Sequence, residues 1–165
     1  ALVSNERGTA YHRVMECLNY SKAGSTEDIK NEIDRMVREE KLSLKQAECI
    51  KLKDIDTFAG SSIGERIKRA YAYGGGKGKQ PFVFEYDRQL VQGVIDLYFI
   101  EDGQLVIVDY KTDRVLRGRA GEDELRRRYS IQLDYYAMAL SQITGLKVKE
   151  KVIYSFALGR SLTVE

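Results

Sequence analysis

The stretch that decides the fold is QGVIDLYFIEDGQLVIVDYKTD, residues 92–113. It reads as two strands rich in β-branched and aromatic residues, joined at Asp102-Gly103, the strongest two-residue hairpin signal that a sequence offers. Both strands are apolar on both faces away from their charged end, which is typical of central strands. Three charged residues nevertheless lie within them: Asp96, Asp109 and Lys111. Because charged side chains are rarely buried without a partner or a function, this hairpin is the first candidate for a functional site.

The hairpin turn determines which residues face each other across the two strands. With Asp102-Gly103 at its centre, Asp96 falls opposite Asp109, and Val94 falls opposite Lys111. Side chains alternate between the two faces of a strand, so Asp109 and Lys111 point the same way and Asp96 lies beside them. A bulge would shift this register by one residue. The opposite face is expected to carry Ile95, Leu97, Phe99, Val106, Val108 and Tyr110.

Asp96 and Asp109 repel each other if both are ionised, and burial increases the cost of ionising them. One acid could keep its proton, Lys111 could neutralise one of them, or a divalent cation, which carboxylate oxygens bind well, could lie between them. A structural alternative also stays open. In it, Asp109 and Lys111 form a buried ion network and Asp96 caps a strand end.

The composition is that of a globular protein. The chain has 165 residues, of which 43% are hydrophobic and 32% are charged, and its net charge is +2. This length predicts a single domain over residues 1–165, with a mainly helical part at 1–75 and a core of sheet and helix at 80–160. The chain starts without Met, so we expect a domain excised from a longer chain. No apolar run is long enough to span a bilayer and no signal peptide is recognisable, which predicts a cytoplasmic protein without a membrane partner.

Periodicity and capping signals predict helices first and strands afterwards. Helices are expected over residues 8–20, 25–41, 43–60, 62–72 and 122–145, and strands within 81–111 and 147–158. The glycine-rich segment 73–81 lacks the Gly-Lys-Ser/Thr ending of a phosphate-binding loop, so a flexible surface loop is expected, in which Lys77 and Lys79 could still contact a polyanion. This order predicts an α/β fold with a central mixed β-sheet flanked by helices, preceded by an N-terminal helical segment.

Several other residues are ambiguous when taken singly. His12, the only histidine, is expected in the first turn of a helix after Gly8, as a surface residue, a packing residue or a metal ligand. Gln132 and Tyr136 lie four positions apart and share one helix face, where aromatic side chains could equally belong to the core.

A basic excess follows the charged hairpin. Residues 111–128 carry seven bases against four acids. The arginines in this run are candidates for contacts to a nucleic-acid backbone. They are Arg114, Arg117, Arg119, Arg126, Arg127 and Arg128. The alternative is a solvated helix face balanced by the acids at 122–124.

Four short motifs occur in order along the chain. They are G-x-x-x-H (Gly8…His12), G-x-x-D (Gly93…Asp96), D-Y-K (Asp109-Tyr110-Lys111) and Q-x-x-x-Y (Gln132…Tyr136). In this order and spacing, over about residues 5–140, they resemble the RecB-type nuclease family of the PD-(D/E)XK superfamily. The hairpin is most similar to the C-terminal nuclease domains of AddA subunits of bacterial helicase–nucleases. The resemblance implies a restriction-endonuclease-like core.

The resemblance also implies roles for the motif residues. The implied metal ligands are His12, Asp96, Asp109 and the backbone carbonyl of Tyr110. Lys111 would orient the attacking water or help to deprotonate it, and Gln132 and Tyr136 would support the site. The implied metal is Mg²⁺, with Mn²⁺ as a substitute because imidazole suits Mn²⁺ better.

One position departs from the family pattern. Relatives often carry a glutamate two residues before the Pro-Phe pair that is Pro81-Phe82 here, whereas this chain has Lys79. Glu85 lies further along the same strand at even spacing, so it is either a replacement ligand or a solvent-facing acid. Cys17 and Cys49 are too few for the four-cysteine cluster of some relatives, so no iron–sulfur cluster is expected in this segment.

The implied activity is metal-dependent hydrolysis of DNA. The resemblance implies an exonuclease that acts on single-stranded DNA, which a helicase portion of the same chain produces during recombinational repair of double-strand breaks. An AddB-type partner subunit is implied as well. Two alternatives stay open: a non-catalytic DNA-binding or scaffolding module of the same fold, and a standalone RecB-type exonuclease.

Overall fold

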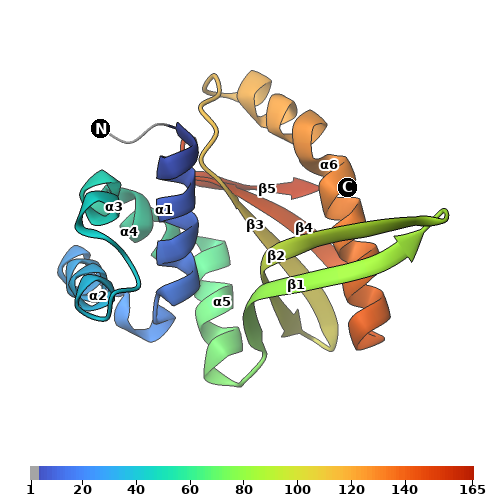
Figure 1. Ribbon diagram of the computed structural model, residues 1–165, viewed down its shortest axis with the longest axis horizontal. Helices are drawn as coiled ribbons and strands as arrows, with labels where there is room; N and C mark the ends of the chain where they lie inside the picture. The colour runs from blue at the N-terminus through green and yellow to red at the C-terminus, as the bar shows by residue number, and fades with distance from the viewer. Residues whose placement is uncertain (1–3) are drawn as a thin grey trace.

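The computed structural model describes residues 4–165, which form a five-stranded sheet between two layers of helices (Figure 1). The helices are α1 (Ser4–Cys17), the 3₁₀ helix η1 (Tyr20–Lys22), α2 (Thr26–Arg38), α3 (Leu44–Cys49), α4 (Leu52–Ala59), α5 (Ser62–Ala72) and α6 (Arg119–Thr144). The strands are β1 (Gly76–Tyr86), β2 (Gln89–Glu101), β3 (Gln104–Lys111), β4 (Val148–Ser155) and β5 (Arg160–Val164). Helices α1 to α5 lie on one side of the sheet and α6 lies on the other (Figure 1).

The sheet is mixed, as the sequence predicted. Its strands lie in the order β1-β2-β3-β4-β5, and all neighbours are antiparallel except β3 and β4. A parallel pair needs a long crossover connection, and α6 lies in the connection between these two strands. The predicted α/β fold with an N-terminal helical segment is therefore confirmed.

The β2–β3 hairpin has the predicted turn, and the predicted register holds as far as Leu97, but the predicted pairs of Asp96 with Asp109 and of Val94 with Lys111 are not formed. Asp102 and Gly103 both adopt left-handed backbone angles, with φ of 55° and 75°, as a primed two-residue turn requires. The strands pair from Glu101 with Gln104 as far as Leu97 with Val108. Beyond Leu97, β2 stays paired with β1 but no longer with β3. The site acids therefore lie where two central strands begin to separate.

The sheet separates two apolar clusters. On the side of α1 to α5, the buried strand residues include Leu97, Phe99, Val106, Val108 and Tyr110, as predicted. The cluster under α6 includes Tyr98, Leu105 and Ile107. Ile95 also packs under α6 and not beside Leu97, which corrects the predicted pattern. The alternation of faces along β2 is thus interrupted at Asp96.

The helix predicted over residues 43–60 is two helices. Ile50 and Lys51 are extended, with ψ of 122° and 115°, and they separate α3 from α4. The Lys51 N–H donates to the hydroxyl of Tyr11 on α1, over 3.2 Å. A side chain distant in sequence therefore stabilises the break.

Two features of the strands also differ from the prediction. The glycine-rich segment is partly strand, because β1 begins at Gly76 and pairs there with Phe99 of β2. The final strand β5 was not predicted at all. It pairs antiparallel with β4, for example Leu162 with Ile153, and covers the edge of β4.

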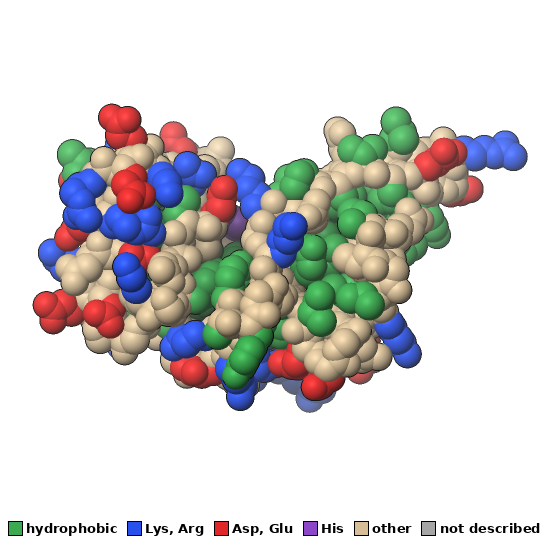
Figure 2. All heavy atoms as spheres, turned by 90° about the horizontal axis from the view of Figure 1, so that it is seen from below, with side chains coloured by type: hydrophobic (Ala, Val, Ile, Leu, Met, Phe, Trp, Pro, Cys, Tyr) green, Lys and Arg blue, Asp and Glu red, His purple; other side chains and the backbone are tan. Residues whose placement is uncertain are grey.

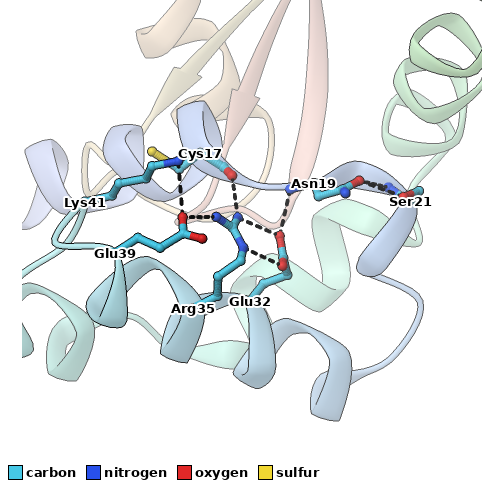
Figure 3. Close-up of polar contacts among 7 residues, drawn as sticks. All are labelled: Cys17, Asn19, Ser21, Glu32, Arg35, Glu39 and Lys41. Carbon is cyan, nitrogen blue, oxygen red and sulfur yellow. Dashed lines mark hydrogen bonds and ion pairs between the residues drawn. The ribbon is translucent and has the colours of Figure 1, made fainter.

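A polar network ties the end of α1 to α2 (Figure 3). Arg35 donates to the Cys17 carbonyl oxygen over 2.9 Å and to both Glu32 and Glu39. Glu32 is only 4% exposed, and its carboxylate also accepts the Asn19 N–H over 2.8 Å. The hydrogen bonds from Arg35 hold the pKa of Glu32 below its usual value despite burial. This network fixes the end of the helix that carries His12.

Cys17 and Cys49 are free thiols and lie partly buried. Burial raises the pKa of Cys49, whose Sγ lies 3.0 Å from the carbonyl oxygen of Gln46. Across residues 4–165, no helix is both long and apolar enough to cross a membrane.

Candidate active site

An open cleft of about 450 Å³ lies between α1 and the central strands. Its lining comes from Asn5, Gly8, Thr9, His12, Arg13 and Glu16 on α1 and from Lys79, Val94, Asp96 and Tyr110 on the sheet. Figure 2 shows a hollow between the helical side and the hairpin, with the histidine side chain, coloured purple, inside it. The cleft therefore exposes one side of the charged hairpin to solvent.

Asp96 connects the sheet to α1. Its Oδ2 accepts the Tyr110 N–H over 2.8 Å, at the point where β2 no longer pairs with β3. The same oxygen lies 3.2 Å from His12 Nε2. His12 Nδ1 lies 2.9 Å from the Gly8 carbonyl oxygen, to which it donates, so Nε2 is the nitrogen left to face the carboxylate.

His12 does not lie in the first turn of its helix, as the sequence predicted. Helix α1 starts at Ser4, so His12 lies in its middle and projects from a rigid segment. The predicted start of the helix was too late, because Gly8 was taken as the residue that precedes it.

Asp109 and Lys111 form a buried ion pair that faces α6. Asp109 is 3% exposed, and its Oδ2 lies 2.9 Å from Lys111 Nζ. The approach is not aligned for a hydrogen bond, so this oxygen has no hydrogen-bond partner among the described residues. Lys111 Nζ also donates to Gln132 Oε1 on α6 over 3.1 Å. The structure thus brings Asp109, Lys111 and Gln132, which come from two of the motifs, into contact with one another.

The protonation states of the site follow from burial and from neighbouring charges. Burial, and then the charge of Asp96, raises the pKa of Asp109 to about 7, although Lys111 opposes the shift. For Asp96, burial acts to raise the pKa, but the hydrogen bond and charge of His12 outweigh it and lower that pKa. Burial likewise opposes protonation of His12, but Asp96 outweighs it and raises the His12 pKa to about 9. The site therefore holds protons near neutral pH without a cation.

Tyr136 and the glycine of the G-x-x-D motif meet in the packing behind the acids. A Cβ on Gly93 would lie 3.0 Å from the Phe82 ring and 3.5 Å from the Tyr136 ring. The two rings pack edge-to-face with centroids 5.5 Å apart. Burial, with the charges of Asp109 and Asp96, raises the pKa of Tyr136 well above its usual value. Tyr136 is therefore a neutral residue next to the acids.

The structure does not bring Glu85 to this group. It is exposed and pairs with Leu90 near the tip of the β1–β2 hairpin. Lys79, by contrast, lies in the cleft, and the pairs on either side of it place it across from Asp96. Glu85 lies six residues further along the strand, which is about 20 Å away.

The six candidate arginines do not share one surface hollow. Arg114 and Arg128 line a hollow of about 410 Å³ beside the N-terminal half of α1. Arg126 and Arg127 line a different one with the C-terminal residues 163–165. Arg128 also pairs with Asp113 and with Glu124. Arg117 and Arg119 are exposed near the start of α6.

Sequence reasoning missed several residues that line the two hollows. Arg7 lies beside Arg114 and Arg128, and Glu16 pairs with Lys79 over 3.4 Å within the cleft. The signal was the helical spacing of α1, because residues at 5, 8, 9, 12 and 16 share one helix face. Tyr129 was also missed; its ring lies under Lys111 Nζ, 3.9 Å from the ring centroid.

The donor set fits a divalent cation, although the site is not preformed. Within residues 4–165, no group of three or more His, Cys, Asp and Glu side chains is arranged to hold a metal ion. His12 and Asp96 instead contact each other. However, Asp109 Oδ2 is buried and without a hydrogen-bond partner in the described structure, and carboxylate oxygens are preferred ligands of such cations.

Known proteins are similar to this chain along most of its length. Residues 1–162 match the PD-(D/E)XK nuclease superfamily. The chain is 34% identical to the A subunit of the ATP-dependent helicase/nuclease of Clostridium novyi, with 92% of this chain and 13% of that protein covered. It is 38% identical to the protein of the same name from a Thermoanaerobacter species, with 98% and 14% covered. The chain thus spans about one seventh of the length of these relatives.

The predicted likeness to the A subunits of helicase–nucleases is therefore confirmed. The match also covers all four motifs, from Gly8 to Tyr136. The chain belongs to the PD-(D/E)XK nuclease superfamily.

Proposed function

We propose that this chain is a metal-dependent deoxyribonuclease domain, spanning residues 1–165, that hydrolyses phosphodiester bonds of single-stranded DNA. The observation that carries the proposal is the buried Asp109, whose unbonded Oδ2 lies 2.9 Å from Lys111 Nζ and close to Asp96 at the cleft. Such a group costs stability, and groups of this kind cluster at catalytic sites.

The metal would be held by His12, Asp96, Asp109 and the backbone carbonyl of Tyr110. We propose Mg²⁺ as the natural cation and Mn²⁺ as a substitute, because the set combines oxygens with one imidazole. When bound, the cation supplies positive charge to the phosphate and lowers the pKa of a coordinated water.

Lys111 has the catalytic role among the residues of the chain itself. During hydrolysis a water oxygen bonds to phosphorus and gives up a proton to solvent, and negative charge grows on the non-bridging oxygens. The bond from phosphorus to the ester oxygen then breaks, and the leaving oxygen takes up a proton from solvent. The ammonium of Lys111 stabilises that charge and orients the water, while Gln132 fixes its direction through the 3.1 Å hydrogen bond. Tyr136 supports Asp96 and Asp109 from behind as a neutral aromatic wall.

The DNA strand would run from the cleft into the adjoining hollow. The two share Asn5 and Gly8 in their linings, so they adjoin along one face of α1. Arg7, Arg114 and Arg128 line the second hollow and would bind phosphates electrostatically. Arg117 and Arg119 would bind phosphates beyond this hollow, whereas Arg126 and Arg127 line a different hollow outside this path.

In the whole protein we propose an exonuclease that degrades single-stranded DNA unwound by a helicase portion of the same chain. This follows the names of relatives, which describe the A subunit of an ATP-dependent helicase/nuclease. A cytoplasmic location, a role in recombinational repair of double-strand breaks, and an AddB-type partner subunit belong to the same proposal.

Asp109→Asn tests the proposal at the protein's natural length, with Glu85→Gln as the matched control. Both changes replace a carboxylate by an amide, but only the first removes a charge from the site. We expect Asp109→Asn to reduce Mn²⁺-dependent cleavage of labelled single-stranded DNA at least about a thousandfold. Glu85→Gln should cleave like the wild type.

The same pair separates catalysis from a scaffolding role. Equal cleavage by wild type and Asp109→Asn, with both folded by circular dichroism, would overturn the proposal. A Mn²⁺ soak of wild-type crystals adds a direct measurement. An anomalous peak at His12, Asp96 and Asp109 is expected, and none at saturating Mn²⁺ would contradict the metal assignment.

A further inference from the structure

The ammonium of Lys111 has three neighbours at contact distance. Asp109 Oδ2 lies at 2.9 Å, Gln132 Oε1 at 3.1 Å, and the centroid of the Tyr129 ring at 3.9 Å. Of these three, only Gln132 accepts a hydrogen bond, whereas Asp109 and the ring attract the ammonium by charge. A cation over an aromatic face is attracted by the electron density of the ring, and more strongly when both are shielded from water.

Tyr129 is itself held in place from the far side. Its hydroxyl donates to Asp113 Oδ2 over 2.5 Å, and Arg128 donates to the same oxygen over 2.9 Å. Asp113 therefore fixes the hydroxyl end of the side chain, while the face of the ring contacts Lys111. Tyr129 and Gln132 lie three positions apart on α6, so the same helix face supplies both contacts to the ammonium.

We propose that Tyr129 is a positioning residue, whose ring fixes the ammonium of Lys111 above Asp109 for the hydrolysis step. This inference rests on the proposed function. Lysine is long and flexible, and one hydrogen bond and one ion pair leave its ammonium free to shift. The ring limits that movement and accepts no classical hydrogen bond, so N–H bonds remain for the attacking water and the phosphate. A displacement of about 1 Å at such a group costs a large factor in rate.

Two substitutions at Tyr129 separate the ring from the hydroxyl. Tyr129→Phe keeps the ring and loses the bond to Asp113, whereas Tyr129→Met fills similar space in a helix without a ring. In the protein at its natural length, with Mn²⁺ and single-stranded DNA, Tyr129→Phe should retain kcat within about threefold. Tyr129→Met should lose kcat about tenfold with KM unchanged. Wild-type kcat in Tyr129→Met would overturn the inference, and so would equal losses in both variants.

A measurement on the metal-free protein tests the contact without any cleavage. Protons on the carbon next to Nζ of Lys111 lie near the ring, so ring currents should shift their nuclear magnetic resonance signals upfield. The shift should persist in Tyr129→Phe and disappear in Tyr129→Met. Unshifted signals in the wild type would overturn the inference even if Tyr129→Met were too unstable to assay.

Lys111→Ala distinguishes failure of the inference from failure of the proposed function. If Lys111→Ala is inactive while Tyr129→Met is fully active, the nuclease proposal stands and the role of Tyr129 falls. If Lys111→Ala cleaves like the wild type, the proposed function falls with it. Binding of Mn²⁺ by calorimetry should be unchanged in Tyr129→Met, because Tyr129 contacts Lys111 and Asp113, which are not among the proposed metal ligands.

Discussion

At the scale of single residues, Asp109 shows how burial sets the charge of the site. A carboxylate that is 3% exposed and close to a second acid is costly to ionise, and its pKa rises to about 7. His12 is shifted in the same direction by Asp96, and its pKa is about 9. Both groups therefore carry protons in the metal-free protein at neutral pH, and a cation must displace them to bind.

Proton release on metal binding follows from these shifts. Asp109 is protonated below about pH 7 and His12 below about pH 9, so Mn²⁺ affinity should rise with pH over this range. At pH 7 protons should be released when Mn²⁺ binds, mainly from His12, whose pKa is about 9. Calorimetry in buffers of different ionisation enthalpy measures the release. His12→Asn should release fewer protons than the wild type. A wild type that releases none would show that the two groups are already deprotonated or do not bind the metal.

At the scale of secondary-structure elements, features set by local sequence signals could be predicted, whereas features set by contacts between distant residues could not. The hairpin turn and the pairing of its strands followed from Asp102-Gly103, because this turn signal lies directly between the two β-rich segments. The helix over 43–60 failed for the opposite reason. Its break at Lys51 is stabilised by Tyr11, forty positions away, while the apolar period continues across the break.

The candidate site was predictable to the same extent. The motifs identified His12, Asp96, Asp109, Lys111 and Gln132, because each motif is a local pattern that can be recognised without the fold. The structure brings all five residues to the end of the hairpin. Which of them touch could not be read from the sequence. That depends on how α1 and α6 lie on opposite sides of the sheet (Figure 1), and this arrangement also brings the unpredicted Tyr129 under Lys111.

Packing between β1, β2 and α6 gives a prediction about Gly93. A Cβ there would lie 3.0 Å from the Phe82 ring, which is buried and packs edge-to-face against Tyr136, so the ring would have to shift. Gly93→Ala should therefore reduce the free energy of unfolding by about 1–3 kcal/mol. In a Phe82→Leu background the same change should cost much less, because the smaller side chain leaves space. Urea denaturation of the four proteins measures the coupling, and equal losses in both backgrounds would contradict this packing argument.

At the scale of the whole molecule, the cleft adjoins the hollow lined by Arg7, Arg114 and Arg128. Helix α1 runs along both, and Asn5 and Gly8 belong to each lining. The net charge of +2 is too small to attract DNA to the protein as a whole. Binding therefore depends on where the arginines lie, and the structure separates Arg114, beside the cleft, from Arg127, in another hollow.

This separation predicts unequal effects of two exposed arginines on DNA binding. In an Asp109→Asn background without metal, which prevents cleavage, Arg114→Ala should weaken binding of single-stranded DNA. It should also reduce the slope of log affinity against log salt by roughly 0.7, the value for one lost phosphate contact. Arg127→Ala is the matched control, since it removes the same charge from an exposed position outside the proposed path. Fluorescence anisotropy over a salt series measures both slopes. If the two variants lose the same slope, the strand does not follow the hollow beside α1, and the basic run acts as a diffuse positive field.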